Sequence, residues 1–250
     1  LNFIKTPDDQ LPLFNGSTIT DLNQIEKYLE NTKQKNNLDK NIGGLFKMKH
    51  RTHLVFMDIE KPPQKNFSKC YQSGPLSFEY FIDRLKIITN SGFGCNISNK
   101  AETLSRLTAS QSTLTLNDTS VSRFEKNELI KKVFGNTIQN NFRFYNLETT
   151  ISNDGYEKNF GCIHRREIYI DKKEDCLKGI DHIFKKKDGY PVRYSFRFHI
   201  NPELTAVKTM GGNGALIQIS KNKSLLFTIK DEKIEIEKSI FLGEKKILDS

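Results

Sequence analysis

Residues 76–89 read Leu-Ser-Phe-Glu-Tyr-Phe-Ile-Asp-Arg-Leu-Lys-Ile-Ile-Thr, and this stretch decides the fold class. Apolar and polar residues alternate through its first half: Leu76, Phe78 and Tyr80 against Ser77 and Glu79. A period of two predicts a β-strand with one face buried. The polar pair at 83–84 suits a tight turn, and a second apolar run follows at 85–89. The stretch therefore predicts a β-hairpin.

Short strands separated by turns are predicted for most of the chain outside this hairpin. We expect paired strands at 45–49 and 52–59, and further strands at 112–117, 142–151, 162–170, 176–184, 192–200, 214–220, 224–230 and 234–242. Residues 119–141 are weakly patterned, and 125–134 fits either a short helix or a loop. Repeated short strands favour a large antiparallel β-sandwich over a doubly wound α/β fold.

A helix is expected only near the N-terminus. Apolar residues recur there at helical spacing, at Ile19, Leu22, Ile25 and Leu29. They predict a helix over about residues 20–34, with Thr20 or Asp21 as its N-cap. The polar stretch 36–41 resembles a linker.

The charge balance is basic, with 39 Lys and Arg against 30 Asp and Glu and a net charge of +9. This excess suits an acidic partner such as a uronate polysaccharide, a nucleic acid or an anionic lipid, although a merely Lys-rich surface gives the same total. The chain has no RNA-binding signature of the KH or RNP type. It also has no apolar run of about 18 residues. We therefore expect neither a nucleic-acid partner nor a membrane span.

Cysteine and histidine spacing predicts no metal or other cofactor. Cys70, Cys95, Cys162 and Cys176 form no Cys-x-x-Cys pair, and the five histidines form no His-x-x-x-His pair. The chain begins at Leu1 rather than Met, so we expect a fragment of a longer protein.

Three motifs carry a resemblance to a known family. They are Gly74–Phe81 (GPLSFEYF), Ile87–Gly94 (IITNSGFG) and Arg106–Asp118 (RLTASQSTLTLND). In this order they resemble the C-terminal domain of heparinase II/III-type polysaccharide lyases, most closely the proteobacterial branch. The resemblance covers most of residues 10–245.

The resemblance implies a fold and an activity. It implies a supersandwich-like β domain over 37–250, with 1–36 as the end of an α/α toroid and a linker; a single helix packed on the sheet is the alternative. It also implies β-elimination on an acidic, uronate-containing glycan, an upstream toroid as partner, and a bacterial periplasm or cell envelope as location. A non-catalytic module that binds polyanionic glycans, or a purely structural sandwich, remains open.

The family's chemical positions are altered here. Where the family has histidines before and after the hairpin, this chain has Cys70, Gln72 and Gln111, and its Asp/Asn position is Asn90. Amides are poor zinc ligands, but they can hydrogen-bond to one another. We therefore expect a degenerate site that serves as a polar tie and holds no metal.

Further candidates come from strand motifs that resemble the family. His164-Arg165-Arg166 and Arg197-Phe198-His199 imply that Arg165, Arg166, Arg197 and His199 contact substrate carboxylates, for which arginine is well suited. Pairing with Asp or Glu on neighbouring strands is the alternative. Tyr71 is a candidate catalytic phenol or a buried structural tyrosine. Arg106 is expected to anchor its loop to a carbonyl or carboxylate.

Overall fold

The computed structural model describes residues 1, 3–30, 41–124, 130–133, 138–139, 148–186, 193–244 and 247–249. Its helices are α1 (Asn23–Glu30), α2 (Asn99–Ser105) and α3 (Glu157–Phe160), with short 3-10 helices at Lys65–Phe67, Gly94–Asn96 and Thr108–Ser110. Its strands are β1 (Asn41–Ile42), β2 (Leu45–His50), β3 (His53–Asp58), β4 (Phe78–Ile82), β5 (Leu85–Thr89), β6 (Leu114–Leu116), β7 (Ser122–Phe124), β8 (Ile130–Val133), β9 (Ile138–Gln139), β10 (Glu148–Asn153), β11 (Cys162–Asp171), β12 (Cys176–Lys185), β13 (Tyr194–Phe196), β14 (His199–Ile200), β15 (Thr205–Lys208), β16 (Gly214–Ser220), β17 (Lys223–Thr228), β18 (Ile240–Phe241) and β19 (Leu248–Asp249).

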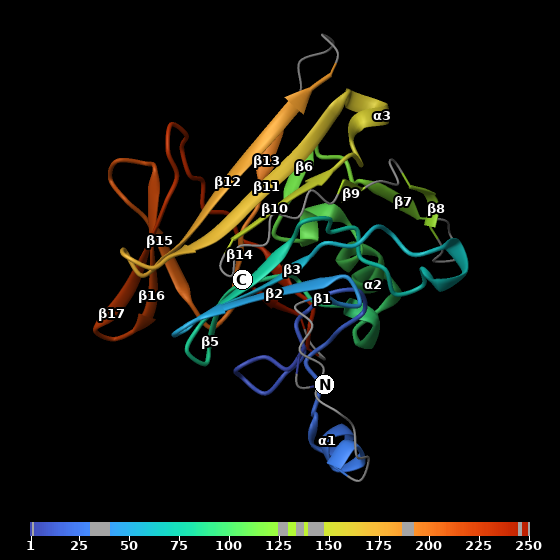
Figure 1. The fold of residues 1–250 in the computed structure, drawn as a ribbon, viewed down its shortest axis with the longest axis horizontal. Helices are drawn as coiled ribbons and strands as arrows, with labels where there is room; N and C mark the ends of the chain where they lie inside the picture. Colours follow the sequence, from blue (N-terminus) through green and yellow to red (C-terminus); the bar gives the residue numbers. More distant parts are fainter. Residues whose placement is uncertain are drawn as a thin grey trace.

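The fold is a mainly β, antiparallel sandwich, as the sequence predicts (Figure 1). The largest sheet has the order β1-β2-β3-β4-β5-β14, and β12-β11-β10-β9 forms a second sheet. Strands β15, β16 and β17 form a third sheet, and the remaining strands form isolated pairs. All the strand pairs of the described residues are antiparallel.

The main core lies where these three sheets face one another. Met57 and Phe78 contribute from the six-stranded sheet, Ile168 and Ile170 from β11, and Ile217 from β16. All five side chains are at most 4% exposed. Burial of apolar surface stabilises a fold by about 25 cal/mol per Å², and this cluster contains more buried apolar side chains than either of the other two described clusters.

The opposite face of the six-stranded sheet is buried too. Leu54, Phe56 and Phe81 point to that face and pack with Phe14 of the N-terminal segment. Glu79, which lies on β4, is 0% exposed. The prediction that β4 has a single buried face is therefore wrong, because chain from outside the sheet covers its second face.

The predicted hairpins are confirmed. Strands β2 and β3 flank the turn that contains Arg51, and β4 and β5 flank the turn that contains Asp83, with both residues at positive φ. Strands β11, β12, β16 and β17 also lie where the alternation predicts them. The helix α1 falls within the expected 20–34, and residues 31–34 lie outside the described residues.

Four predictions differ from the structure. The strand expected at 192–200 is divided into β13, which pairs with β6, and β14, which pairs with β5 in another sheet. Only Ile240–Phe241 of the strand expected at 234–242 forms. Part of the range 125–134, predicted as a short helix or a loop, is the strand β8, which pairs with β7; the rest of that range lies outside the described residues. Residues 142–147 of the strand predicted at 142–151 also lie outside the described residues. The helix α2 was not predicted, although Ser98 is a good N-cap and accepts a hydrogen bond from the Ala101 N–H.

One buried arginine joins the sheets. Arg166 on β11 is 1% exposed. Its Nη1 donates to the carbonyls of Leu76 (2.8 Å) and Ser112 (3.0 Å), while its Nε and Nη2 donate to Asp181 of β12 at 2.7 and 3.0 Å. His164 also lies 2.7 Å from Asp181. Arg166 therefore links the β11–β12 hairpin to the segments that flank β4 and β6.

Arg166→Met should strongly destabilise the fold. It leaves the Asp181 carboxylate without its main partner and two buried carbonyls without a donor. Loss of one member of a buried pair costs about 3–5 kcal/mol. Denaturant unfolding monitored by circular dichroism measures the change.

Arg165→Met is the matched control, because Arg165 directly precedes Arg166 in β11 and its side chain is 37% exposed. Its loss should cost no more than about 1 kcal/mol. Equal costs for the two variants would contradict the structural role of Arg166.

Candidate functional site

The three motifs meet beside the six-stranded sheet. The segment before β4 and the segment between β5 and β6 pack against each other at Gly74. A Cβ built on Gly74 would lie 2.7 Å from Cγ of Gln111 and 2.9 Å from Oγ of Ser77. Leu76, just before β4, adopts a φ of 60°, a left-handed conformation that is uncommon for a non-glycine residue. The first motif is thus fitted tightly onto the third.

Two of the three family-position amides converge on one acceptor. Gln72 and Gln111 both donate from Nε2 to the Ser105 carbonyl, at 2.9 and 2.8 Å. Gln72 also donates to the Gly92 carbonyl (3.1 Å) and accepts from the Gly16 N–H (3.1 Å). Both side chains are 1% exposed. Both polar atoms of the Gln72 amide and the Nε2 of Gln111 bond to backbone groups, so the pair ties the N-terminal segment, α2 and the first motif together.

Asn90 lies at the end of β5 and serves a different contact. Its Oδ1 accepts from the Ser112 N–H at 2.9 Å, and its Nδ2 has no hydrogen-bond partner among the described residues. Ser112 Oγ in turn donates to the Thr89 carbonyl at 2.6 Å. Asn90 therefore links β5 to the third motif, and no hydrogen bond in the described part of the chain joins it to Gln72.

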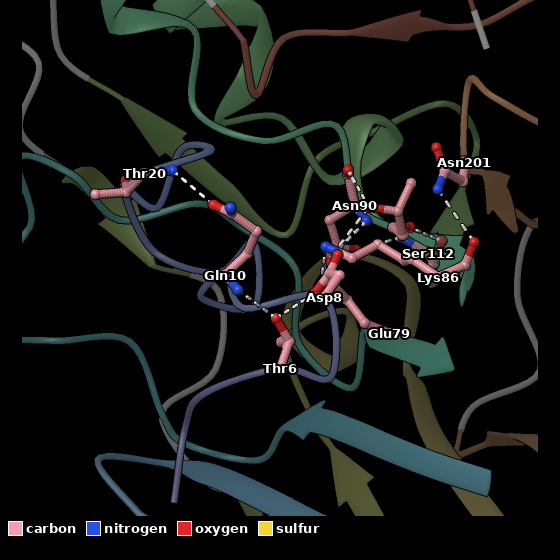
Figure 2. A network of polar contacts seen from close by, with 10 residues as sticks. Thr6, Asp8, Gln10, Thr20, Glu79, Lys86, Asn90, Ser112 and Asn201 are labelled. Atoms are coloured by element: carbon pink, nitrogen blue, oxygen red, sulfur yellow. Dashed lines mark hydrogen bonds and ion pairs between the residues drawn. The ribbon is translucent and has the colours of Figure 1, made fainter. Parts of the chain in front are cut away.

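A buried ion pair that the sequence did not indicate lies beside Asn90 (Figure 2). Lys86 Nζ lies 3.3 Å from Glu79 Oε2, and the two side chains are 7% and 0% exposed. Glu79 Oε1 also accepts from Thr89 Oγ1 at 3.0 Å, and the Lys86 ammonium lies over the ring of Phe81. The alternation of β4 places Glu79 opposite the main core. Only the segments that cover this face turn that position into an interior one.

Tyr71 is a buried tyrosine at 5% exposure. Burial, followed by the nearby Asp58 carboxylate, raises the pKa of its phenol far above the ordinary value, despite hydrogen bonds with Ser122 and Ser73. A phenol with so high a pKa stays protonated at neutral pH and cannot act as a base there. Cys70, the adjacent family position, is exposed and forms no disulfide.

Arg106 anchors its loop to backbone carbonyls, which is one of the two outcomes the sequence predicts. Its Nε donates to the Tyr71 carbonyl at 3.0 Å and its Nη2 to the Ser68 carbonyl at 2.8 Å. The guanidinium lies 4.0 Å from the ring centre of Phe124. Arg106 is 2% exposed, so it holds the first motif in place and does not face solvent.

The candidate substrate-binding residues do not share one surface. His164 and Arg166 point into the core, which assigns Arg166 to the interior rather than to a glycan-binding face. Arg165 points the other way, lies 3.0 Å from Glu167 and stacks 5.0 Å from the ring centre of Phe184. His182, paired with Arg165 across the hairpin, stacks on the same ring. This half-exposed face therefore combines a guanidinium with an aromatic ring.

Arg197 and His199 lie around the break between β13 and β14. Arg197 is 30% exposed and lies 3.7 Å from Asp118. His199 Nε2 lies 3.0 Å from the Ala109 carbonyl, and its Nδ1 lies 2.9 Å from Ser239 Oγ. Desolvation lowers the pKa of His199 to about 4, so its imidazole is neutral at pH 7 and both ring nitrogens are occupied. The Arg197 side chain is partly exposed to solvent, whereas the His199 ring is held by contacts with other parts of the fold.

Asp58, at the end of β3, is a titratable group that the sequence did not single out. It is 4% exposed and accepts a hydrogen bond from the Glu60 N–H at 3.3 Å. Burial raises the pKa of this carboxyl to about 7. A single Asp at the end of an apolar strand gives no sequence signal for this shift, which depends on the chain folded over it.

The donor set at the three motifs does not fit a metal ion. The Gln72 oxygen already accepts from the Gly16 N–H, and amides such as those of Gln72 and Gln111 are weak ligands for zinc. Among the residues described, no three His, Cys, Asp or Glu side chains are grouped to hold one. In that same part of the chain, no helix has the length and apolar character to cross a membrane.

Comparison with known proteins relates this site to a family. The family model described as "Heparinase II/III-like, C-terminal" matches residues 34–249. No curated protein sequence is significantly similar to the chain.

Solved structures share the fold at low sequence identity. Heparan sulfate lyase HepC from Pedobacter heparinus is similar with a TM-score of 0.70 and 18% identity, covering 99% of this chain and 41% of that one. A mutant of the same lyase gives a TM-score of 0.71 at 17% identity with the same coverage. Heparinase III gives 0.67 at 13%, covering 99% and 43%. The chain thus spans about two fifths of the length of these structures.

Gly74→Ala should loosen the contact between the first and third motifs. The new Cβ would overlap Gln111 and Ser77 side-chain atoms, and overpacking of this kind costs about 1–3 kcal/mol. Gly179→Ala on β12 is the control, since its Cβ would meet nothing closer than 3.5 Å. That variant should keep or slightly raise stability, because alanine is less flexible than glycine. A Gly74→Ala protein as stable as Gly179→Ala would contradict the tight fit.

Asp58→Asn should change how stability depends on pH. The folded pKa of about 7 lies above the ordinary 3.8, so the folded state binds this proton more tightly than the unfolded chain. The contribution is fully present below the ordinary pKa and is lost as pH rises through about 7. Asparagine stays neutral, so the variant should gain stability over wild type as pH rises through this range. Denaturant unfolding at a series of pH values measures it.

Glu203→Gln is the matched control, because Glu203 is exposed and is not among the groups that shift the Asp58 pKa, so its profile should be parallel to that of wild type. If the Asp58→Asn profile were parallel as well, the raised pKa would be disproved.

Proposed function

The chain belongs to the heparinase II/III-like C-terminal family, and from this premise we propose that it is the β-sandwich domain of a polysaccharide lyase acting on acidic, uronate-containing glycans. The observation that supports the proposal most is the family match over residues 34–249, which includes all three motifs. The net charge of +9 is consistent with a polyanionic substrate.

β-Elimination at a uronic acid makes three demands on a protein. The sugar carboxylate must be neutralised, a base must remove the proton at C5, and an acid must protonate the leaving oxygen. Arg165 and Arg197 are the family-motif arginines of this chain that keep partly exposed guanidinium groups. We assign them to contacts with glycan carboxylates, where a planar guanidinium can bind in a bidentate manner.

The acid and base are proposed to come from another part of the protein. Tyr71 is buried with a pKa far above the ordinary value, and both ring nitrogens of His199 are engaged, so neither side chain is placed to exchange a proton with a glycan. The chain spans about two fifths of the length of the similar lyases, which leaves room for a further domain. We propose that residues 1–36 are the end of a helical toroid, that the toroid carries the proton-transfer residues, and that the protein works in a bacterial periplasm or cell envelope without a nucleic-acid partner.

A second candidate function is a non-catalytic sandwich that binds polyanionic glycans. Its supporting observation is the replacement of the family histidines by Cys70, Gln72 and Gln111, of which the two amides donate hydrogen bonds to backbone carbonyls. In this case the motifs keep the fold of the family and have lost its chemistry.

The 250-residue chain alone should produce no unsaturated uronate from any glycan. Ultraviolet absorbance of the unsaturated product, measured over a panel of uronate glycans, tests this, and turnover by the isolated chain would refute it. The same assay on the longer protein separates the two candidates. Product formation supports the lyase, while glycan binding without product supports the binding module.

A further inference from the structure

A basic hollow lies away from the three motifs, where the N-terminal segment crosses strand β2 and the turn between β4 and β5. Its volume is about 420 Å³. Four cations and one carboxylate line it: Lys5, Lys47, Lys49 and Arg84 with Asp9. A volume of this size falls within the range of small-ligand sites and exceeds what a single ion needs.

Two of the cations that line the hollow are already paired with carboxylates. Lys5 lies 2.6 Å from Glu26 and 3.0 Å from Asp9. Arg84 also pairs with Asp9. The single carboxylate of the hollow is therefore shared between two cations. It fixes the course of the N-terminal segment and leaves little charge to neutralise the other lysines.

The other two cations come from β2 and have no carboxylate partner in the described residues. Lys47 and Lys49 are two residues apart, so they point to the same face of the sheet. Lys47 Nζ donates to the Phe3 carbonyl at 2.7 Å and lies over the rings of Phe3 and Phe56, at 5.4 and 5.2 Å. The Lys47 ammonium is thus held in place, and among the described residues one of its three N–H donors has an acceptor.

The environment of Lys47 is electrostatically unfavourable without an anion. Burial, and then the charge of Lys49, lower the pKa of the Lys47 ammonium. A bound anion would attract both ammonium groups and remove this penalty, since an opposite charge within about 4–6 Å favours the charged form.

We propose that this hollow binds an anionic sugar residue, with a sulfate or carboxylate group held by Lys47 and Lys49 and by the nearby Arg84. The proposal rests on the proposed function, because it names a second contact point for the same acidic glycan. Leu54 supplies an apolar part of the lining, which suits the hydrocarbon face of a sugar ring.

A nucleic acid fits the hollow less well. Single-stranded nucleic acids need aromatic faces on which bases stack. The two rings beside the hollow, Phe3 and Phe56, already lie under the Lys47 ammonium. The site therefore has charge and volume for an anionic sugar but no free ring for a base.

The test compares two charge-matched double variants of the chain. Lys47→Gln with Lys49→Gln removes the proposed ligands, and Lys221→Gln with Lys223→Gln removes two exposed lysines, one from the β16–β17 turn and one from the start of β17. A sulfated heparin hexasaccharide and an unsulfated uronate oligosaccharide are titrated by calorimetry. We expect the first variant to weaken binding by about tenfold and the second by less than about twofold. Loss on the sulfated probe alone identifies a sulfate site, and loss on both identifies a carboxylate site.

Folding of the variants is checked by circular dichroism. Lys49→Gln alone serves as a second probe, because Lys49 is exposed and its replacement leaves the packing of Lys47 intact. That variant should weaken binding by about threefold. Equal weakening by the two double variants, or none by either, overturns the inference.

The binding assay tests the hollow, and the product assay tests the lyase activity, so the two proposals can fail independently. If glycan binding is unchanged in the Lys47→Gln, Lys49→Gln double variant, the proposed binding site is wrong and the lyase proposal is unaffected. If the double variant loses glycan binding and the longer protein forms no unsaturated product, the binding site is supported and the lyase proposal fails. No binding of either probe by wild type overturns the site, while the product assay still decides the lyase.

Discussion

The contact between the Arg166 guanidinium and two carbonyls is the constraint on which the site depends. Leu76 and Ser112 belong to the first and third motifs, and Arg166 belongs to the hairpin β11–β12 on the other side of the core. Asp181 on the next strand neutralises the arginine. Burial would raise the pKa of the Asp181 carboxyl, but Arg166 and His164 outweigh this effect. The pKa of Asp181 therefore lies below the ordinary value. An isolated cation would be too costly to bury at this point, so the pair allows irregular chain to be held inside the molecule.

The irregular segments around β4 follow the same physical rule. They run through the interior, so each of their polar groups needs a partner. Gln72, Gln111 and Arg106 supply side-chain donors to carbonyls that no strand can satisfy. A side-chain amide supplies this hydrogen-bonding capacity without a charge that would be costly to bury. The irregular segments of this heparinase II/III-like domain are therefore held by neutral amides as well as by arginine.

The sequence predicts what depends on neighbouring residues. Hairpins such as β2–β3 and β4–β5 join strands that are adjacent in the chain, and their alternation and turn residues define them. Tertiary contacts decide the rest. The run at 192–200 alternates without interruption, yet it divides because β6 and β5 lie in different sheets and each takes one part. The burial of Glu79 and the raised pKa of Asp58 likewise depend on which distant segment covers them, and no local pattern records that.

Within a strand, alternation decides between a structural and an exposed role for similar residues. Arg165 and Arg166 are adjacent and chemically identical, and a resemblance to a family motif cannot separate them. The strand places one on each face, so Arg166 is enclosed with Asp181 while Arg165 keeps solvent on its guanidinium. The same geometry puts Lys47 and Lys49 on one side of β2 with the apolar Phe46 and Met48 on the other. Lys47 and Lys49 have no carboxylate partner among the described residues, so their charge is free to attract a ligand, whereas the charge of Arg166 is neutralised by Asp181 inside the fold.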